Sequence, residues 1–145
     1  MKIVRTVTVD RPLAEVFAYL SDFTTTEEWD PGTVSTTLQG GDGGVGTTYH
    51  NVSRFLGRET SLTYEVLEST PPSLLRLRGE NETVVAHDTM SVAPSASGGT
   101  ELTYRAEFEF KGMARLVAPL AAPAFKRLGD KAEEGLRAAL GRAHS

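Results

Sequence analysis

The sequence predicts an α+β fold in which a curved, seven-stranded antiparallel sheet wraps around a long C-terminal helix, with short helices after the first strand. Three observations predict it. Seven segments alternate apolar and polar residues, short connections join the later segments, and the chain ends in a stretch with helical spacing of apolar residues. A sheet of this size twists, and only one long helix can cover its apolar face. We therefore expect the sheet to curl around that helix.

The first strand is expected at residues 3–9, where β-branched residues alternate with polar ones. From Pro12 to Leu20 the apolar residues recur at helical spacing, and a proline in the first turn costs no hydrogen bond. This helix is expected to end near Ser21 or Asp22. A second short helix is expected at residues 23–29, before a turn.

The remaining strands follow from alternation between turn residues, and their short connections predict antiparallel hairpins. The expected strands are Thr33 to Gln39, Thr47 to Phe55, Glu59 to Ser69, Leu74 to Gly79, Thr83 to Ala93 and Thr100 to Phe110. The long helix is expected at residues 113–140, with kinks at Pro119 and Pro123. Its apolar stripe is expected to comprise Leu116, Leu120, Ala124, Leu128, Ala132 and Leu136.

A single domain covering residues 1–145 is expected, because one hydrophobic core commonly serves about 100 to 200 residues. With 39% hydrophobic and 23% charged residues, the composition excludes disordered and collagen-like chains. The formal net charge of −4 disfavours sequence-independent binding to nucleic acid, which requires a surplus of Lys and Arg. We therefore expect no nucleic acid partner, and either a monomer or a homodimer.

The start of the chain does not resemble a secretory signal, because residues 1–9 alternate instead of forming an apolar core. The longest nearly apolar stretch, residues 116–125, contains two prolines and is much shorter than the roughly 20 residues that span a bilayer. We expect a cytoplasmic protein without stable membrane insertion.

An internal apolar cavity is expected from the composition of the terminal helix. Small side chains that face a curled sheet leave volume that the protein does not fill, and the expected inward surface is largely Ala118, Ala121, Ala122, Ala124, Gly129 and Ala132. Large sheet residues offer an alternative, because protein interiors are normally close-packed. The residues that could close the space in this way are Tyr49, Tyr64, Tyr104, Phe108 and Phe110.

Asp88 is the candidate catalytic residue. It shares a strand face with Ala86 and Met90, because side chains two residues apart point the same way, and this face is the concave one. Burial there would raise the pKa of the carboxyl towards the range useful for general acid or base catalysis. Alternatively, an inward arginine, Asn51 or a tyrosine hydroxyl satisfies Asp88 as a structural group. We favour the structural interpretation.

The same strand parity predicts the ligand-binding wall, which is mainly apolar with a few polar groups, as in small-molecule pockets. Asn51 and Asp88 would orient polar ends of a ligand. An ordinary core with satisfied tyrosines has the same composition, and Trp29 is either a lid over the cavity or a packing anchor. The expected ligand-binding residues are Trp29, Tyr49, Asn51, Tyr64, Met90, Tyr104, Phe108, Leu120 and Phe125.

No metal or cofactor is expected. The chain has no cysteine, and His50, His87 and His144 lack the spacing of metal ligands. The glycines of residues 41–46 match a dinucleotide-binding pattern, but an expected strand follows them where that pattern requires a helix.

Several short motifs spread over nearly the whole chain are specific as a set. They are Val7-Thr8-Val9-Asp10-Arg11-Pro12, Glu15-Val16-Phe17, Leu20-Ser21-Asp22, Trp29-Asp30-Pro31-Gly32, Gly57-Arg58, Tyr64-Glu65-Val66, Pro71-Pro72 and Gly99-Thr100. In these motifs the sequence resembles the START-like, or SRPBCC, superfamily, and in particular its bacterial polyketide cyclase/dehydrase-like branch.

This resemblance implies a helix-grip fold with a deep pocket between the sheet and the terminal helix, used for lipids, sterols, polyketides and other apolar molecules. We expect the chain to bind a small hydrophobic or aromatic molecule. One alternative is a polyketide aromatase/cyclase or dehydratase with Asp88 as the general acid or base. A second is a protein-binding regulatory module, which a contiguous exposed apolar patch would indicate.

Overall fold

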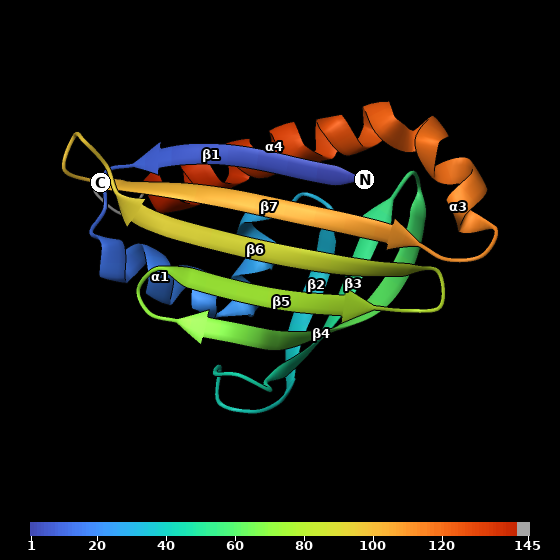
Figure 1. Cartoon of the computed structure of the whole chain (residues 1–145), viewed down its shortest axis with the longest axis horizontal. Coiled ribbons are helices and arrows are strands. Elements are labelled where there is room, and N and C mark those ends of the chain that lie inside the picture. The colour runs from blue at the N-terminus through green and yellow to red at the C-terminus, as the bar shows by residue number, and fades with distance from the viewer. Residues whose placement is uncertain (142–145) are drawn as a thin grey trace.

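The computed structural model describes residues 1–141, and within them one seven-stranded antiparallel sheet has the strand order β1-β7-β6-β5-β4-β3-β2 (Figure 1). The strands are β1 (Lys2–Val9), β2 (Thr33–Gly40), β3 (Thr48–Phe55), β4 (Arg58–Thr70), β5 (Leu74–Glu80), β6 (Val84–Pro94) and β7 (Thr100–Phe110). The helices are α1 (Leu13–Ser21), η1 (Phe23–Thr25), α2 (Thr26–Trp29), α3 (Ala114–Val117), η2 (Ala118–Ala121) and α4 (Ala122–Gly141).

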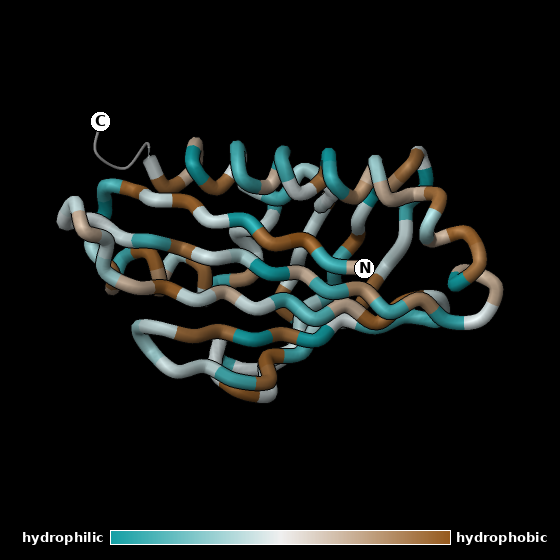
Figure 2. Tube along the Cα trace, turned by 45° about the horizontal axis from the view of Figure 1, so that its top comes forward, coloured by the Kyte–Doolittle hydropathy of each residue, from teal (hydrophilic) through white to brown (hydrophobic). Residues whose placement is uncertain are grey.

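The predicted fold class is confirmed. From β2 to β7 each strand pairs with the next along the chain, and β1 pairs with β7 from Lys2 opposite Glu107 to Val9 opposite Thr100. Helix α4 packs along β1 and against α2, whereas α1 packs against β6. The sheet curves around these helices, and Figure 2 shows apolar and polar residues alternating along its strands. The concave face therefore carries the core.

The C-terminal helix bends as its prolines predict, since η2 contains Pro119 and α4 begins next to Pro123. The predicted stripe is wrong in its first half, because Leu116 and Leu120 are largely exposed. A 3₁₀ turn has three residues per turn, so the residues before it lose register with the stripe of α4. Ala122, predicted to face inward, is exposed as well. The residues of α4 that are buried are Phe125, Gly129, Ala132, Leu136 and Leu140.

A glycine in α4 allows the helix to approach α2 closely. A Cβ atom at Gly135 would lie 2.0 Å from the backbone oxygen of Trp29, so no side chain fits there without a backbone shift. Trp29 itself is buried and packs edge-on against Tyr104 of β7, with ring centroids 5.3 Å apart. The contact between Gly135 and Trp29 thus fixes the height of α4 above the sheet.

We expect Gly135→Ala to lower the free energy of unfolding by about 1–3 kcal/mol, because the added methyl group overpacks against backbone. Gly141→Ala is the control, since a Cβ at Gly141 meets no atom within 4 Å. Alanine is the better helix former, so the control is expected to leave stability unchanged or raise it by up to about 1 kcal/mol. Urea denaturation of both variants measures the difference, and equal stabilities would contradict the close approach.

Candidate functional site

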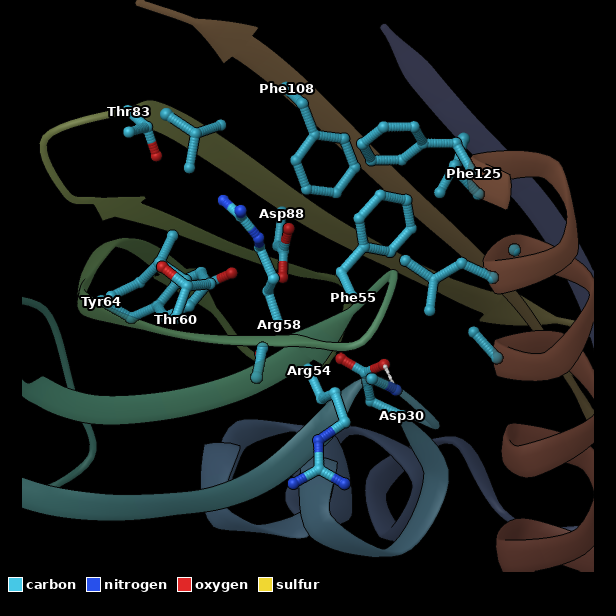
Figure 3. A pocket seen from close by; sticks show the side chains of 18 of the residues that line it. Asp30, Arg54, Phe55, Arg58, Thr60, Tyr64, Thr83, Asp88, Phe108 and Phe125 are labelled. Carbon is cyan, nitrogen blue, oxygen red and sulfur yellow. Dashed lines mark hydrogen bonds between the residues drawn. The ribbon is translucent and has the colours of Figure 1, made fainter. Parts of the chain in front are cut away.

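A cavity of about 380 Å³ lies between the concave face of the sheet and α4, as the sequence predicts (Figure 3). It is lined from the α2–β2 turn, from five strands and from one side of α4. The lining residues are Ile3, Asp30, Gly32, Ser53, Arg54, Phe55, Arg58, Glu59, Thr60, Leu62, Tyr64, Thr83, Val84, Asp88, Tyr104, Phe108, Phe110, Phe125, Leu128, Gly129 and Ala132.

An aromatic cluster forms one wall of the cavity. The ring of Phe125 lies 4.6 Å from that of Phe55, 5.1 Å from that of Phe108 and 5.7 Å from that of Phe110. Phe108 and Phe110 share a face of β7 because side chains two residues apart in a strand point the same way. Phe55 is the last residue of β3, which lies next to the edge strand β2, and contacts α4 from the other side of the sheet. This cluster therefore joins the two margins of the curved sheet through α4.

The small residues of α4 contribute to the cavity less than the sequence suggests. Of the predicted small inward residues, Gly129 and Ala132 line the cavity. A Cβ atom at Gly129 would lie 2.6 Å from a methyl carbon of Ile3. Gly129 thus permits close packing of α4 on β1 and adds little empty volume itself.

Asp88 lies in the middle of β6, opposite Ala106 of β7 and Leu77 of β5, and only 6% of its surface is exposed. Its carboxyl group faces the cavity, as strand parity predicts. Within residues 1–141, no hydrogen bond or ion pair involves this carboxyl group. The prediction that an inward arginine, Asn51 or a tyrosine hydroxyl pairs with Asp88 is therefore wrong.

Asn51 forms hydrogen bonds with residues other than Asp88. Its side-chain amide donates a hydrogen bond of 2.9 Å to the Thr36 hydroxyl and its carbonyl oxygen accepts one of 2.6 Å from Ser53. The Thr36 hydroxyl in turn lies 2.7 Å from that of Thr26. These contacts tie β2 and β3 to the short helices. Asn51 is thus part of a buried polar network and does not line the cavity.

Burial raises the pKa of Asp88 to about 8, and the negative charge of Asp30 adds to the increase. Burial also raises the pKa of Asp30, although hydrogen bonds of 3.1 Å from the Gly32 amide and the Thr33 hydroxyl oppose this effect. At neutral pH the Asp88 carboxyl is therefore mostly protonated. It can donate a hydrogen bond or a proton, and it can accept a proton once ionised.

Two tyrosines complete the polar part of the wall. Tyr64 and Tyr104 line the cavity, and burial, followed by the charge of Asp88, raises the pKa of each phenol well above its ordinary value. The Tyr64 ring covers Gly79 on the neighbouring strand, where a Cβ would lie 2.6 Å from a ring carbon. Both phenols therefore remain neutral hydrogen-bonding groups over the physiological pH range.

The structure brings together five of the predicted site residues, namely Tyr64, Asp88, Tyr104, Phe108 and Phe125. Trp29 and Met90 are buried in the core, and the position of Trp29 is that of a packing anchor. Tyr49 packs on Phe23, with ring centroids 5.6 Å apart. Leu120 lies outside the cavity because the 3₁₀ turn directs it to solvent.

Asp30 is the main site residue that sequence reasoning missed. It follows the buried Trp29 in an Asp-Pro-Gly turn, which is typical of a simple connection. Arg54, Arg58 and Glu59 were missed as well; they lie around the β3–β4 turn and are exposed, and Arg54 pairs with Glu59 at 2.6 Å. Thr83, in the β5–β6 connection, is also exposed and lines the cavity, so the mouth lies between this connection and the β3–β4 turn.

The histidines predicted not to bind metal are only partly visible, since His144 lies outside the described residues. Across residues 1–141, no cluster of three or more His, Asp or Glu side chains is arranged to hold a metal ion.

An internal cavity between a curved antiparallel sheet and a C-terminal helix defines the helix-grip class of proteins. Within this class, the chain belongs to the family described as polyketide cyclase/dehydrase and lipid transport, whose model matches residues 1–141. The resemblance to START-like proteins that the sequence motifs indicate is thereby confirmed. No curated protein matches the sequence.

Solved structures share the fold at low sequence identity. The Zhui aromatase/cyclase from Streptomyces sp. R1128 is 13% identical with a TM-score of 0.84, over 100% of this chain and 96% of that one. A Thermus thermophilus protein is 14% identical with a TM-score of 0.82, over 100% of both chains. A START superfamily protein from Mycobacterium smegmatis is 14% identical with a TM-score of 0.72, over 95% of this chain and 98% of that one. These likenesses establish the fold.

We expect Asp88→Asn to stabilise the protein relative to the wild type, and more so at about pH 8 than at about pH 5. The folded-state pKa of Asp88, about 8, exceeds the unfolded value of about 3.9, so the folded state holds the proton longer. Wild-type stability therefore falls with rising pH between these two values, by at most about 1.4 kcal/mol per pH unit. The neutral amide removes this contribution.

Urea denaturation at both pH values measures this effect. The exposed Asp10→Asn change serves as the control and is expected to shift stability equally at the two pH values. A pH-independent difference between wild type and Asp88→Asn would show that the carboxyl is not desolvated.

Proposed function

We propose that this protein binds a small hydrophobic or aromatic molecule in the cavity between the sheet and α4. The observation that carries the proposal is the cavity itself: about 380 Å³ of space remains after the side chains have packed, behind a wall of phenylalanine and aliphatic residues. This volume falls within the range of small-molecule sites, which are mainly apolar with a few polar groups. Filling it with a ligand removes apolar surface from water and restores dispersion contacts.

The polar groups of the wall would orient the ligand. The cavity wall carries Asp88 of β6, Tyr64 of β4 and Tyr104 of β7. A protonated Asp88 can donate to a carbonyl or hydroxyl oxygen, which would satisfy a buried carboxyl that has no hydrogen bond within the described chain. The favoured ligand is therefore an apolar or aromatic molecule with at least one oxygen function. The family's description, which combines polyketide cyclases with lipid transport, supports this ligand class.

A thermal-shift panel of fatty acids, sterols and aromatic polyketides tests the binding proposal. A molecule that binds only the folded protein at about 100 times its Kd adds about 2.7 kcal/mol to stability, which raises the melting temperature by several degrees. Val84→Phe places a larger side chain in the cavity wall and is expected to weaken binding at least about tenfold, by steric exclusion.

Val45→Phe is the matched control, because Val45 is exposed in the β2–β3 connection outside the cavity. It is expected to bind like the wild type. Saturating ligand without any thermal shift, or equal affinities of the two phenylalanine variants, would count against a ligand in this cavity.

A specific observation favours catalysis as a second candidate function. Asp88 is a carboxyl group in a cavity wall, has no hydrogen bond or ion pair within residues 1–141, and has a pKa of about 8. Such a group exchanges protons near neutral pH. In an aldol closure, protonated Asp88 would give its proton to the carbonyl oxygen as an enol carbon forms the new C–C bond. The resulting carboxylate would accept the proton released from the enol hydroxyl, which restores the acid.

The likeness to a solved aromatase/cyclase supports this alternative at the level of fold. We expect Asp88→Asn to lower the rate of cyclisation of a poly-β-ketone substrate by at least about 100-fold while ligand affinity changes little, because general acid–base groups act on the reacting atoms. The pH–rate profile of the wild type should show an inflection near the pKa of about 8. Unchanged turnover in Asp88→Asn would remove Asp88 from the reaction.

A further inference from the structure

A helical stripe of apolar residues faces solvent at the start of the C-terminal helical segment. The residues are Met113, just before α3, Leu116 and Val117 in α3, and Leu120 in the 3₁₀ turn η2. Their exposed fractions are 78%, 70%, 59% and 82%, respectively. Figure 2 shows apolar residues gathered where the chain leaves β7 and enters α3. A helix face of this kind is normally buried, so its exposure indicates a partner.

Besides the stripe, the exposed apolar residue Leu56 lies at the same end of the molecule. Leu56, at the tip of the β3–β4 turn, is 67% exposed. Its φ angle is +54° and that of Gly57 is +79°, a turn geometry that favours Asn-Gly and is costly for leucine. The neighbouring Phe55 packs on Phe125 of α4, so the turn lies beside the helical segment (Figure 1). A leucine at this position does not serve the folding of the turn.

The charge around the stripe is opposite to that of the rest of the chain. Residues 111–129 contain four of the fifteen basic residues and none of the nineteen acidic ones, which leaves eleven basic and nineteen acidic residues elsewhere. Lys111 is paired with Glu80. Arg115, Lys126 and Arg127 are exposed and make no ion pair within the part of the chain that the structure describes. The segment that carries the stripe is therefore both apolar and basic, and the acidic residues Glu59 and Glu80 at the same end are paired with Arg54 and Lys111.

We propose that this end, comprising Leu56, the stripe Met113, Leu116, Val117 and Leu120, and the cations Arg115, Lys126 and Arg127, docks reversibly on an anionic lipid bilayer. An apolar helix face flanked by cations is the pattern of interfacial helices, whose apolar residues enter the boundary between headgroups and acyl chains. Anionic lipids attract this end and repel the acidic remainder, which sets the orientation. No helix within residues 1–141 is long and apolar enough to span the bilayer, so the contact stays at its surface.

Docking in this orientation goes beyond binding of a ligand and does not require an occupied cavity. Arg54, Arg58 and Glu59, which surround Leu56 in the β3–β4 hairpin, are exposed residues that line the cavity, together with Thr83 of the β5–β6 connection at the same end of the sheet. The mouth of the cavity would therefore open towards the bilayer. An apolar molecule could then move between membrane and cavity with little exposure to water.

Co-sedimentation with vesicles tests the proposal, using phosphatidylcholine alone and phosphatidylcholine with about 30% phosphatidylglycerol. We expect the wild type to bind the anionic vesicles at low salt and to dissociate as salt increases. The double variant Leu116→Ser/Leu120→Ser should bind at least about tenfold less, because it removes two inserted side chains. The triple variant Arg115→Gln/Lys126→Gln/Arg127→Gln should lose the preference for anionic vesicles.

Val34→Ser/Leu38→Ser is the matched control, since both residues are exposed apolar residues of β2, at the opposite edge of the sheet from β1. This control should bind vesicles like the wild type, and all variants should keep the wild-type melting temperature because the changed residues are exposed. Absence of binding to anionic vesicles, or equal binding by the two serine variants, would overturn the proposal. So would a dimer in light scattering that Leu116→Ser/Leu120→Ser dissociates, because the stripe would then be a protein interface. Thermal shifts by cavity ligands are independent of all these results.

Discussion

The structure depends on how closely one helix approaches one curved sheet. Two glycines let α4 approach its neighbours closely, because Gly129 admits Ile3 and Gly135 admits the backbone of Trp29. Beyond these contacts Leu136 and Leu140 are completely buried. Towards its N-terminal end α4 meets the sheet through the large ring of Phe125, which bridges to both margins of the sheet. The cavity lies along this stretch of α4, which contributes Phe125, Leu128, Gly129 and Ala132 to its lining, and ends before the tight contact at Gly135.

The cavity also accounts for the chemistry of Asp88. A carboxyl group in a closely packed core would need a cation or several donors, because an isolated buried charge is very costly. At the wall of a cavity the same group can remain protonated and keep its hydrogen-bonding capacity for whatever enters. Asp30 reinforces this state, since its negative charge disfavours ionisation of the Asp88 carboxyl. The buried carboxyl lowers the stability of the fold at a candidate binding site, and such sites are where proteins commonly depart from the rules of good packing.

Strand parity predicted much of this site from sequence, because alternation placed Asp88 and Tyr104 on the concave face and both line the cavity. Parity does not distinguish a cavity wall from a filled core, since both face inward. Asn51 shows this limit: it points inward but meets a threonine of β2, where the short helices close the concave face. Asp30 was beyond prediction for a different reason. It approaches Asp88 through a tertiary arrangement, and its Asp-Pro-Gly turn has no periodicity and a composition typical of surface connections.

The error at Leu120 connects the two surfaces of the molecule. An uninterrupted helical period from Leu116 to Leu136 would have placed two further leucines against the end of the sheet, next to Phe108 and Phe110. With the turn at Pro119, Arg115, Ala118 and Ala122 instead line an open surface groove together with those phenylalanines, and the leucines are exposed. A side chain as small as alanine cannot fill the space that a leucine would fill. The same change of helical register therefore leaves no leucine beside Phe108 and Phe110, which line the cavity, and creates the exposed apolar stripe.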